Sequence, residues 1–438
     1  MRLIYKFTVA LFLLPLVVQG QNNAKTFSGD SLSLSTIINE VMRNYPSVKK
    51  AELDIESANA KIGLAKSAYY PNVDVSSSYS HIGPNSSITF PGLGTFNMYP
   101  LDNYSAALNY NQLIYDFGKT GKSVSFEQQS KSLTQLSVEQ LKQKLSLAVV
   151  GNYYSIVFLQ EAIRIKDEEL ATLNEHLLFI EKKEATGSAT QYEILTTKVR
   201  ISNIENQKTD LLTSLQVQLC QLNTLLGQPQ NTALTVKKEL PVTPMATSGD
   251  SLITYAFDHR DELKMAHQKN TLAQIHYKMV DAQNNPAFNF FASGGWKNGY
   301  FPDLLTPKAN YAVGVGFKIP IFDATRTKYN RQQVKLEILN NDQDTELARR
   351  DIVNEVVESK TNADASLKKV TESELQLTQA QQAYSLAETS FQAGAITNLD
   401  LLDSSTSLSE SRLALLKTKI DYTVSLLKLK IALGDRIY

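Results

Sequence analysis

The chain has almost no cysteine and no excess of charge of either sign. Cys220 is the only cysteine in 438 residues, which excludes an internal disulfide and a cysteine-rich metal site. Lysine plus arginine and aspartate plus glutamate both number 44, so no net charge points to nucleic acid as a partner. The five histidines lack the spacing of metal ligands, and no G-x-S-x-G motif occurs. We therefore expect no enzyme activity and no cofactor.

Long apolar runs are missing too, except for one near the N-terminus. The run from Phe7 to Val18 follows the basic residues Arg2 and Lys6 and ends in small residues at Gly20. This order predicts a cleaved export signal at residues 1–20. A membrane anchor is the alternative, but the run falls short of the roughly 20 residues that a spanning helix needs. Contact with a membrane must then come from strands.

The chain contains an internal duplication. Pro71 aligns with Pro286 at a separation of 215 residues. Further on, a separation of 207 residues persists without a gap and pairs Asp116 with Asp323, Gly187 with Gly394, Thr190 with Thr397 and Gly227 with Gly434. The change in separation indicates an eight-residue insertion in the first copy, between its proline and its aspartate.

The duplication predicts two similar domains. The first covers residues 30–227 and the second residues 251–434, and an exposed linker at 228–250 connects them. Each copy should contain a helix, a β-hairpin, a long helix, a turn and a further helix. We expect the hairpins at 72–114 and 287–321 and the turns near Gly187 and Gly394.

The stretch "YDFGKTGKS" ends like a nucleotide-binding P-loop but is predicted to be a strand-to-helix junction. The P-loop pattern requires a glycine where this chain has Asp116. The second copy of the stretch, "IFDATRTKY", retains the aromatic residue and the aspartate, Asp323, but neither Gly118 nor the Gly121-Lys122 pair. Both aspartates are positioned to cap the helix that follows, and Pro71 and Pro286 precede the hairpins.

Four segments alternate between apolar and small or polar residues, as β-strands with two different faces do. They are Val73–Ile82, Tyr104–Ile114, Phe288–Trp296 and Tyr311–Ile321. Such alternation is typical of outer-membrane barrel strands, although a half-exposed soluble sheet has the same pattern. Four strands cannot close a barrel, and open edges are not stable in lipid. Two, three or four copies would supply eight, twelve or sixteen strands, and the sequence does not choose among them.

Most of the remaining chain is predicted to be long helix with a coiled-coil pattern. Apolar residues recur every three or four positions, for example in the run Leu170, Leu173, Leu177 and Ile180. Between Gly121 and Ala185 there is no proline. Such rods need partner helices to cover their apolar stripes.

The whole pattern resembles the TolC-like outer-membrane efflux proteins. The marks are "NYPSV", the junctions "IYDFGKT" and "IPIFDATRT", and the turn motifs "ATGSATQYEILTTKVRISN" and "FQAGAITNLDLLDSSTSLSESR". The resemblance implies an α+β membrane protein, a homotrimer whose shared 12-stranded β-barrel lies in outer-membrane lipid and continues as a helical tunnel through the periplasm. It also implies a periplasmic adaptor and an inner-membrane pump of the RND, MFS or ABC type as partners.

The resemblance also assigns a role to the helical turns. Glu193, Asp400 and Asp403 are similar to the carboxylates that line the closed periplasmic entrance of these channels. Gly187, Thr190, Gly394 and Thr397 would then form the tips where the adaptor docks. The alternative is that the three carboxylates only stabilise the first turn of their helices. Ile396 replaces an arginine of the family's turn, so an ion pair at that position is doubtful.

The resemblance predicts a passive exit duct for efflux or type I secretion. The alternative is a soluble periplasmic scaffold of long helices without a pore. The exported substrate cannot be deduced from these residues.

Overall fold

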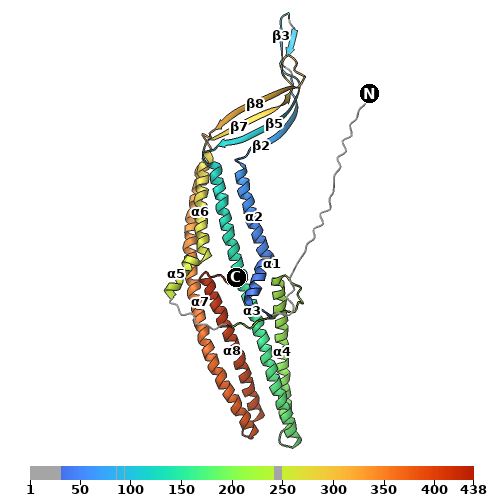
Figure 1. The fold of residues 1–438 in the computed structure, drawn as a ribbon, viewed down its shortest axis with the longest axis vertical. Helices are drawn as coiled ribbons and strands as arrows, with labels where there is room; N and C mark the ends of the chain where they lie inside the picture. Colours follow the sequence, from blue (N-terminus) through green and yellow to red (C-terminus); the bar gives the residue numbers. More distant parts are fainter. Residues whose placement is uncertain (1–30, 85, 93, 241–248) are drawn as a thin grey trace, which may run out of the picture.

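The computed structural model describes residues 31–84, 86–92, 94–240 and 249–438. The predicted export signal and part of the predicted linker lie outside these residues. The protein is an elongated bundle of helices with a four-stranded sheet at one end (Figure 1). The helices α3 (Lys119–Ala185) and α7 (Arg326–Gln392) run the full length of the bundle, and each of these 67-residue helices measures about 100 Å.

Shorter helices pair with these two rods along each half of the bundle (Figure 1). Near the sheet, α2 (Pro46–Ser67) packs on α3, and α6 (Asp261–Asp281) packs on both α3 and α7. At the far end, α4 (Gln191–Leu226) returns along α3, and α8 (Asn398–Ala432) returns along α7 and also touches α3. The apolar stripe predicted from the sequence contributes to these contacts, since Leu170, Leu173, Leu177 and Ile180 all belong to or pack against apolar clusters between the helices.

The sheet has the strand order β2-β5-β7-β8 and is antiparallel throughout. Its strands are β2 (Asn72–His81), β5 (Asp102–Tyr115), β7 (Ala287–Lys297) and β8 (Lys308–Lys318). One face carries apolar rows such as Val75, Leu108 and Tyr311, all exposed. The other face is mostly polar or small, with Phe291 as an exception, and Asn109 on it donates to Asp74 at 2.9 Å. The strands β2 and β8 form open edges.

The loop between β2 and β5 contains a second ribbon that the sequence analysis did not predict. In it, β3 (Ser87–Phe90) pairs with β4 (Gly94–Asn97) and projects beyond the end of the sheet (Figure 1). The predicted insertion falls in this loop. The alternation of Ile88, Phe90 and Phe96 with threonines was the signal that could have revealed it.

The two strand-to-helix junctions share an unusual backbone conformation. Phe117 and Gly118 have φ of 53° and 85°, and Ala324 and Thr325 have φ of 54° and 66°. The preceding aspartate of each junction accepts a hydrogen bond from the N–H of the first helical turn: Asp116 from Thr120 at 2.6 Å, and Asp323 from Thr327 at 2.9 Å. Both copies therefore build the same turn, although only the first has a glycine.

A belt of short segments surrounds the middle of the bundle. It contains β1 (Ser31–Leu32), α1 (Leu34–Asn44), β6 (Thr235–Val236) and α5 (Gly249–His259), and β1 pairs with β6 in parallel. The described first part of the predicted exposed linker, 228–240, is exposed at most of its positions, but Leu234 and Val236 are buried in the main apolar core. The Tyr153 hydroxyl also donates to the Lys237 carbonyl at 2.6 Å. None of the helices within the described ranges is long and apolar enough to cross a membrane.

Candidate functional site

Two tight turns close the helical hairpins at the end of the bundle farthest from the sheet (Figure 1). Gly187 and Gly394 occupy the left-handed region there, with φ of 75° and 77°. In each turn, the N–H after the glycine bonds back to a carbonyl of the ending helix: Ser188 to Lys183, and Ala395 to Ser390, both at 2.8 Å. This hydrogen-bonding pattern terminates the helix. Its left-handed backbone conformation favours glycine, because glycine has no β-carbon that would clash there.

The next helix begins in each copy with a reciprocal capping box. The Thr190 hydroxyl accepts from the N–H of Glu193 at 3.3 Å, and the Glu193 carboxylate accepts from the N–H of Thr190 at 2.6 Å. Thr397 and Asp400 repeat this exchange at 3.3 and 2.9 Å. Hydrogen bonds from the Thr397 hydroxyl and N–H hold the pKa of Asp400 below its usual range. Both carboxylates are thus fixed on their own helices.

The third predicted carboxylate has a different partner. Asp403 accepts from the Arg200 guanidinium at 2.7 Å, which links α8 to α4. The Asp403 side chain is 63% exposed and Arg200 is 27% exposed. The sequence analysis missed Arg200, because nothing within the turn motif that contains it indicates that its partner is Asp403, 203 residues farther along the chain. The ion pair ties the two hairpins together close to their turns.

Asn398 is the centre of a buried polar contact between the hairpins. Its side chain is almost fully buried, and its carbonyl oxygen lies 2.7 Å from Nε2 of His176 on α3, which donates to it. Its amide donates to the Thr197 hydroxyl at 3.2 Å and to the Glu193 carbonyl at 3.3 Å. One side chain of α8 therefore bonds to both helices of the other hairpin. Burial lowers the pKa of His176, so the ring is held neutral.

An apolar cluster covers this polar contact. It contains Ile180, Ile194, Phe391 and Leu401, and Ile396 packs against it. Ile396 is therefore part of the packing between the hairpins and contributes by dispersion and burial.

A second buried polar contact lies one hydrophobic layer farther from the turns. The Lys166 ammonium donates to the Glu169 carboxylate at 2.9 Å, and the Ser409 hydroxyl of α8 donates to the same carboxylate at 2.5 Å. All three side chains are at least nine-tenths buried. This contact again connects α3 with α8, so the hairpins are held at more than one level.

The structure gathers only some of the predicted site residues. Glu193, Asp400 and Asp403 lie together at the hairpin end, close to the turns at Gly187 and Gly394. Pro71, Asp116, Pro286 and Asp323 lie at the other end of the bundle, next to the sheet (Figure 1). Hydrogen bonds from Thr327 and Asn284 hold the pKa of Asp323 well below its usual range, which suits a structural capping role.

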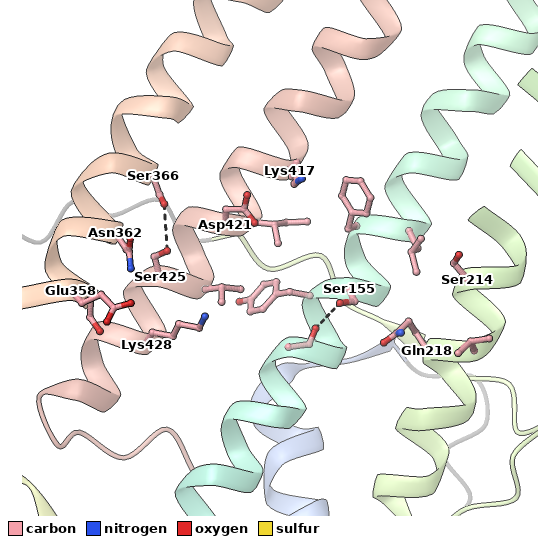
Figure 2. A pocket seen from close by; sticks show the side chains of 18 of the residues that line it. Ser155, Ser214, Gln218, Glu358, Asn362, Ser366, Lys417, Asp421, Ser425 and Lys428 are labelled. Carbon is pink, nitrogen blue, oxygen red and sulfur yellow. Dashed lines mark hydrogen bonds between the residues drawn. The ribbon is translucent and has the colours of Figure 1, made fainter. Parts of the chain in front are cut away.

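A groove of about 1010 Å³ runs between the hairpins at mid-height (Figure 2). Tyr154 and Phe158 of α3 line it, next to Tyr153, which bonds to the belt. Lys417, Asp421 and Lys428 on α8 and Glu358 on α7 are among the residues that line the groove (Figure 2). The charges are of both signs and do not converge on one point, so the groove does not define a ligand. Within the described ranges no three metal-ligating side chains come together.

Comparison with known proteins agrees with this architecture. The model of the family described as "Outer membrane efflux protein" matches residues 37–228 and 252–435. Outer membrane protein TolC of Vibrio cholerae is 21% identical over 429 residues, which cover 96% of this chain and 95% of that protein. Two crystal structures share the fold. VceC of Vibrio cholerae has a TM-score of 0.73 and 19% identity, covering 92% of this chain and 97% of VceC. The open state of MtrE of Neisseria gonorrhoeae has a TM-score of 0.73 and 17% identity, covering 92% and 89%.

These matches confirm the resemblance to the TolC-like proteins and the expected fold class of long coiled-coil helices with a small number of strands. They decide against the alternative prediction of a soluble periplasmic scaffold without a pore. The chain belongs to the outer membrane efflux protein family and serves in the outer membrane as the exit channel of an efflux system.

Proposed function

We propose that three copies of the chain form one passive conduit, which opens and closes at the turns of its helical hairpins. The observation that carries the proposal is the sheet, which has two open edges, β2 and β8, and one exposed apolar face. Open edges are not stable in lipid, so β2 of one copy would pair with β8 of the next. Three copies would give the 12-stranded barrel that the family resemblance implies.

The duct would carry substrate without doing chemical work. The groove between the hairpins has charges of both signs, as expected of a wall that water and varied solutes pass. A periplasmic adaptor and an inner-membrane pump would supply selectivity and energy. The adaptor would meet the exposed turns at Gly187, Thr190, Gly394 and Thr397, where the hairpins end. The chain would be made as a signal peptide, 1–20, followed by the two repeats.

The entrance would be closed by the contacts between the two hairpins of each copy. Asn398 and the Arg200–Asp403 ion pair connect them near the turns, and Ile396 adds apolar packing. Glu193 and Asp400 are held in their capping boxes and would make the entrance attractive to cations. Opening would then require the hairpin α7–α8 to separate from α3–α4.

Two measurements test the proposal. Detergent-extracted protein should migrate as a trimer, and a monomer that stays in aqueous buffer after a salt wash would refute the assembly. Replacing both Asp400→Ala and Asp403→Ala should raise single-channel conductance in planar bilayers or weaken block by multivalent cations. The matched control is Asp364→Ala on α7, an exposed carboxylate away from the turns that pairs only within its own helix. Unchanged conductance and block in the double variant would remove the assignment of the entrance.

A further inference from the structure

The β3–β4 ribbon has one apolar face that stays largely exposed in the described part of the chain. Ile88 lies opposite Phe96 in the register, and Phe90 lies on the same face. These side chains are 42–48% exposed, and the two phenylalanine rings touch edge to face at 6.1 Å. The opposite face is polar, since the hydroxyls of Thr89 and Thr95 are hydrogen-bonded at 2.9 Å.

The apolar face forms one side of a shallow groove of about 540 Å³. Met98 continues the face, and Phe301 from the loop between β7 and β8 lines the groove as well. A two-stranded ribbon is marginally stable in water by itself and needs a further strand or a packing partner. An exposed aromatic face at the end of a ribbon therefore indicates a contact that the single chain does not make.

Three kinds of partner could cover this face: charged lipid headgroups, a foreign protein or another copy of the chain. Residues 86–98 contain no lysine, arginine, aspartate or glutamate. Recognition of phosphorylated headgroups would call for basic side chains, so an anionic lipid surface does not fit. An uncharged, aromatic face fits another apolar surface.

The sheet topology brings such a surface to the ribbon. If the open edge β2 pairs with β8 of a neighbouring copy, as the proposed assembly requires, the loop that precedes β8 arrives beside the ribbon that follows β2. That loop displays Phe301 at 64% and Leu305 at 71% exposure. Apolar side chains of one copy would thus lie against the apolar face of the next.

We propose that the β3–β4 ribbon of each copy packs its apolar face on the β7–β8 loop of the neighbouring copy, forming an apolar collar at the end of the sheet away from the helices. This inference rests on the proposed assembly. The contact repeats around the ring, because each copy contributes one ribbon and one loop. The insertion that distinguishes the first hairpin from the second thereby acquires a role in joining the copies.

Cysteine cross-linking tests the collar. In a Cys220→Ser background, Phe96→Cys combined with Leu305→Cys should give covalent dimers and trimers with a short flexible bismaleimide. The matched control, Thr89→Cys with Leu305→Cys, presents its thiol on the polar face of the ribbon and should give far less product. Equal cross-linking of the two pairs, or none with Phe96→Cys, would overturn the collar.

Two further readouts separate failure of the collar from failure of the assembly. Phe96→Ser should lower the temperature at which the detergent-solubilised trimer dissociates, whereas Thr95→Ala on the polar face should not. A trimer with unchanged dissociation temperature would refute the collar alone, and a monomer from the unmodified chain would refute the assembly. Rapid labelling of Phe96→Cys on intact cells by a membrane-impermeant maleimide would show an open face and also overturn the collar. Protection without cross-linking would assign the face to lipid or to a foreign partner, against the proposal.

Discussion

Replacing Asn398 by alanine should open the entrance more than breaking any single ion pair near the turns. Asn398→Ala removes the hydrogen bonds to His176 and Thr197, each worth about 1 kcal/mol net, and leaves the part-buried His176 N–H without its partner at a further cost of up to about 1 kcal/mol. The total of about 3 kcal/mol per copy corresponds to roughly a hundredfold change in the ratio of closed to open hairpins. The Arg200–Asp403 pair is partly exposed, and such pairs contribute at most about 1 kcal/mol.

The assay is single-channel conductance in planar bilayers, supported by the sensitivity of cells to a large antibiotic that the closed duct excludes. Asn398→Ala should spend more time in high-conductance states and sensitise the cells. Asn174→Ala is the matched control, because that exposed side chain on α3 bonds only to the Leu170 carbonyl of its own helix. If Asn398→Ala assembles normally and conducts like the unmodified chain, the hydrogen-bonded contact does not hold the entrance closed.

Three further predictions follow from local contacts. Thr325→Gly should raise the free energy of unfolding by about 1 kcal/mol, because glycine adopts the left-handed conformation of this position without steric strain. Gly118→Thr should lower the free energy of unfolding by a similar amount, because it introduces the same strain. Thermal unfolding in detergent measures both effects, and changes of the same sign would contradict the prediction. Because burial lowers the pKa of His176, its contribution to closure is complete above the ordinary pKa of 6.5 and is lost as the pH falls below it. Conductance should therefore rise on acidification, and a His176→Gln channel with the same response would exclude the ring as the cause. Lys166→Met should destabilise the protein by about 3 kcal/mol, since it leaves a carboxylate buried without its cation. Lys368→Met, at an exposed pair, should change the melting temperature little, and equal effects of the two substitutions would refute the importance of burial.

The repeated parts of the fold could be predicted from the sequence because their signals are local. Helix spacing, the left-handed glycines Gly187 and Gly394, and the capping pairs Thr190–Glu193 and Thr397–Asp400 each depend on residues a few positions apart. The equal lengths of α3 and α7 follow the constant separation of 207 residues. Such features are decided by backbone conformation and by the 3.6-residue period.

The belt and the ribbon were less accessible to sequence reasoning. A polar, proline-containing linker predicts an exposed connection, but Leu234 and Val236 find buried positions against α3, and β6 pairs with β1 over two hundred residues away. The two-residue strands β1 and β6 are too short to show any periodicity in the sequence, and the four-residue strands of the ribbon show only a brief alternation. Ile88 and Phe96 form an apolar face only because the pairing of β3 with β4 places them opposite each other.

The sequence by itself determined the internal duplication, the long amphipathic helices, the turns between them and the alternating strands. Helix and strand periodicity and helix capping depend on residues that are close together along the chain. Only the tertiary structure decided how the hairpins are fastened. Asn398 meets His176, and Arg200 meets Asp403, across more than two hundred residues of chain. The physical reason is that a hydrogen bond or an ion pair depends on distances of about 3 Å in space, and no pattern along the chain specifies which distant side chains the packing of helices will bring that close.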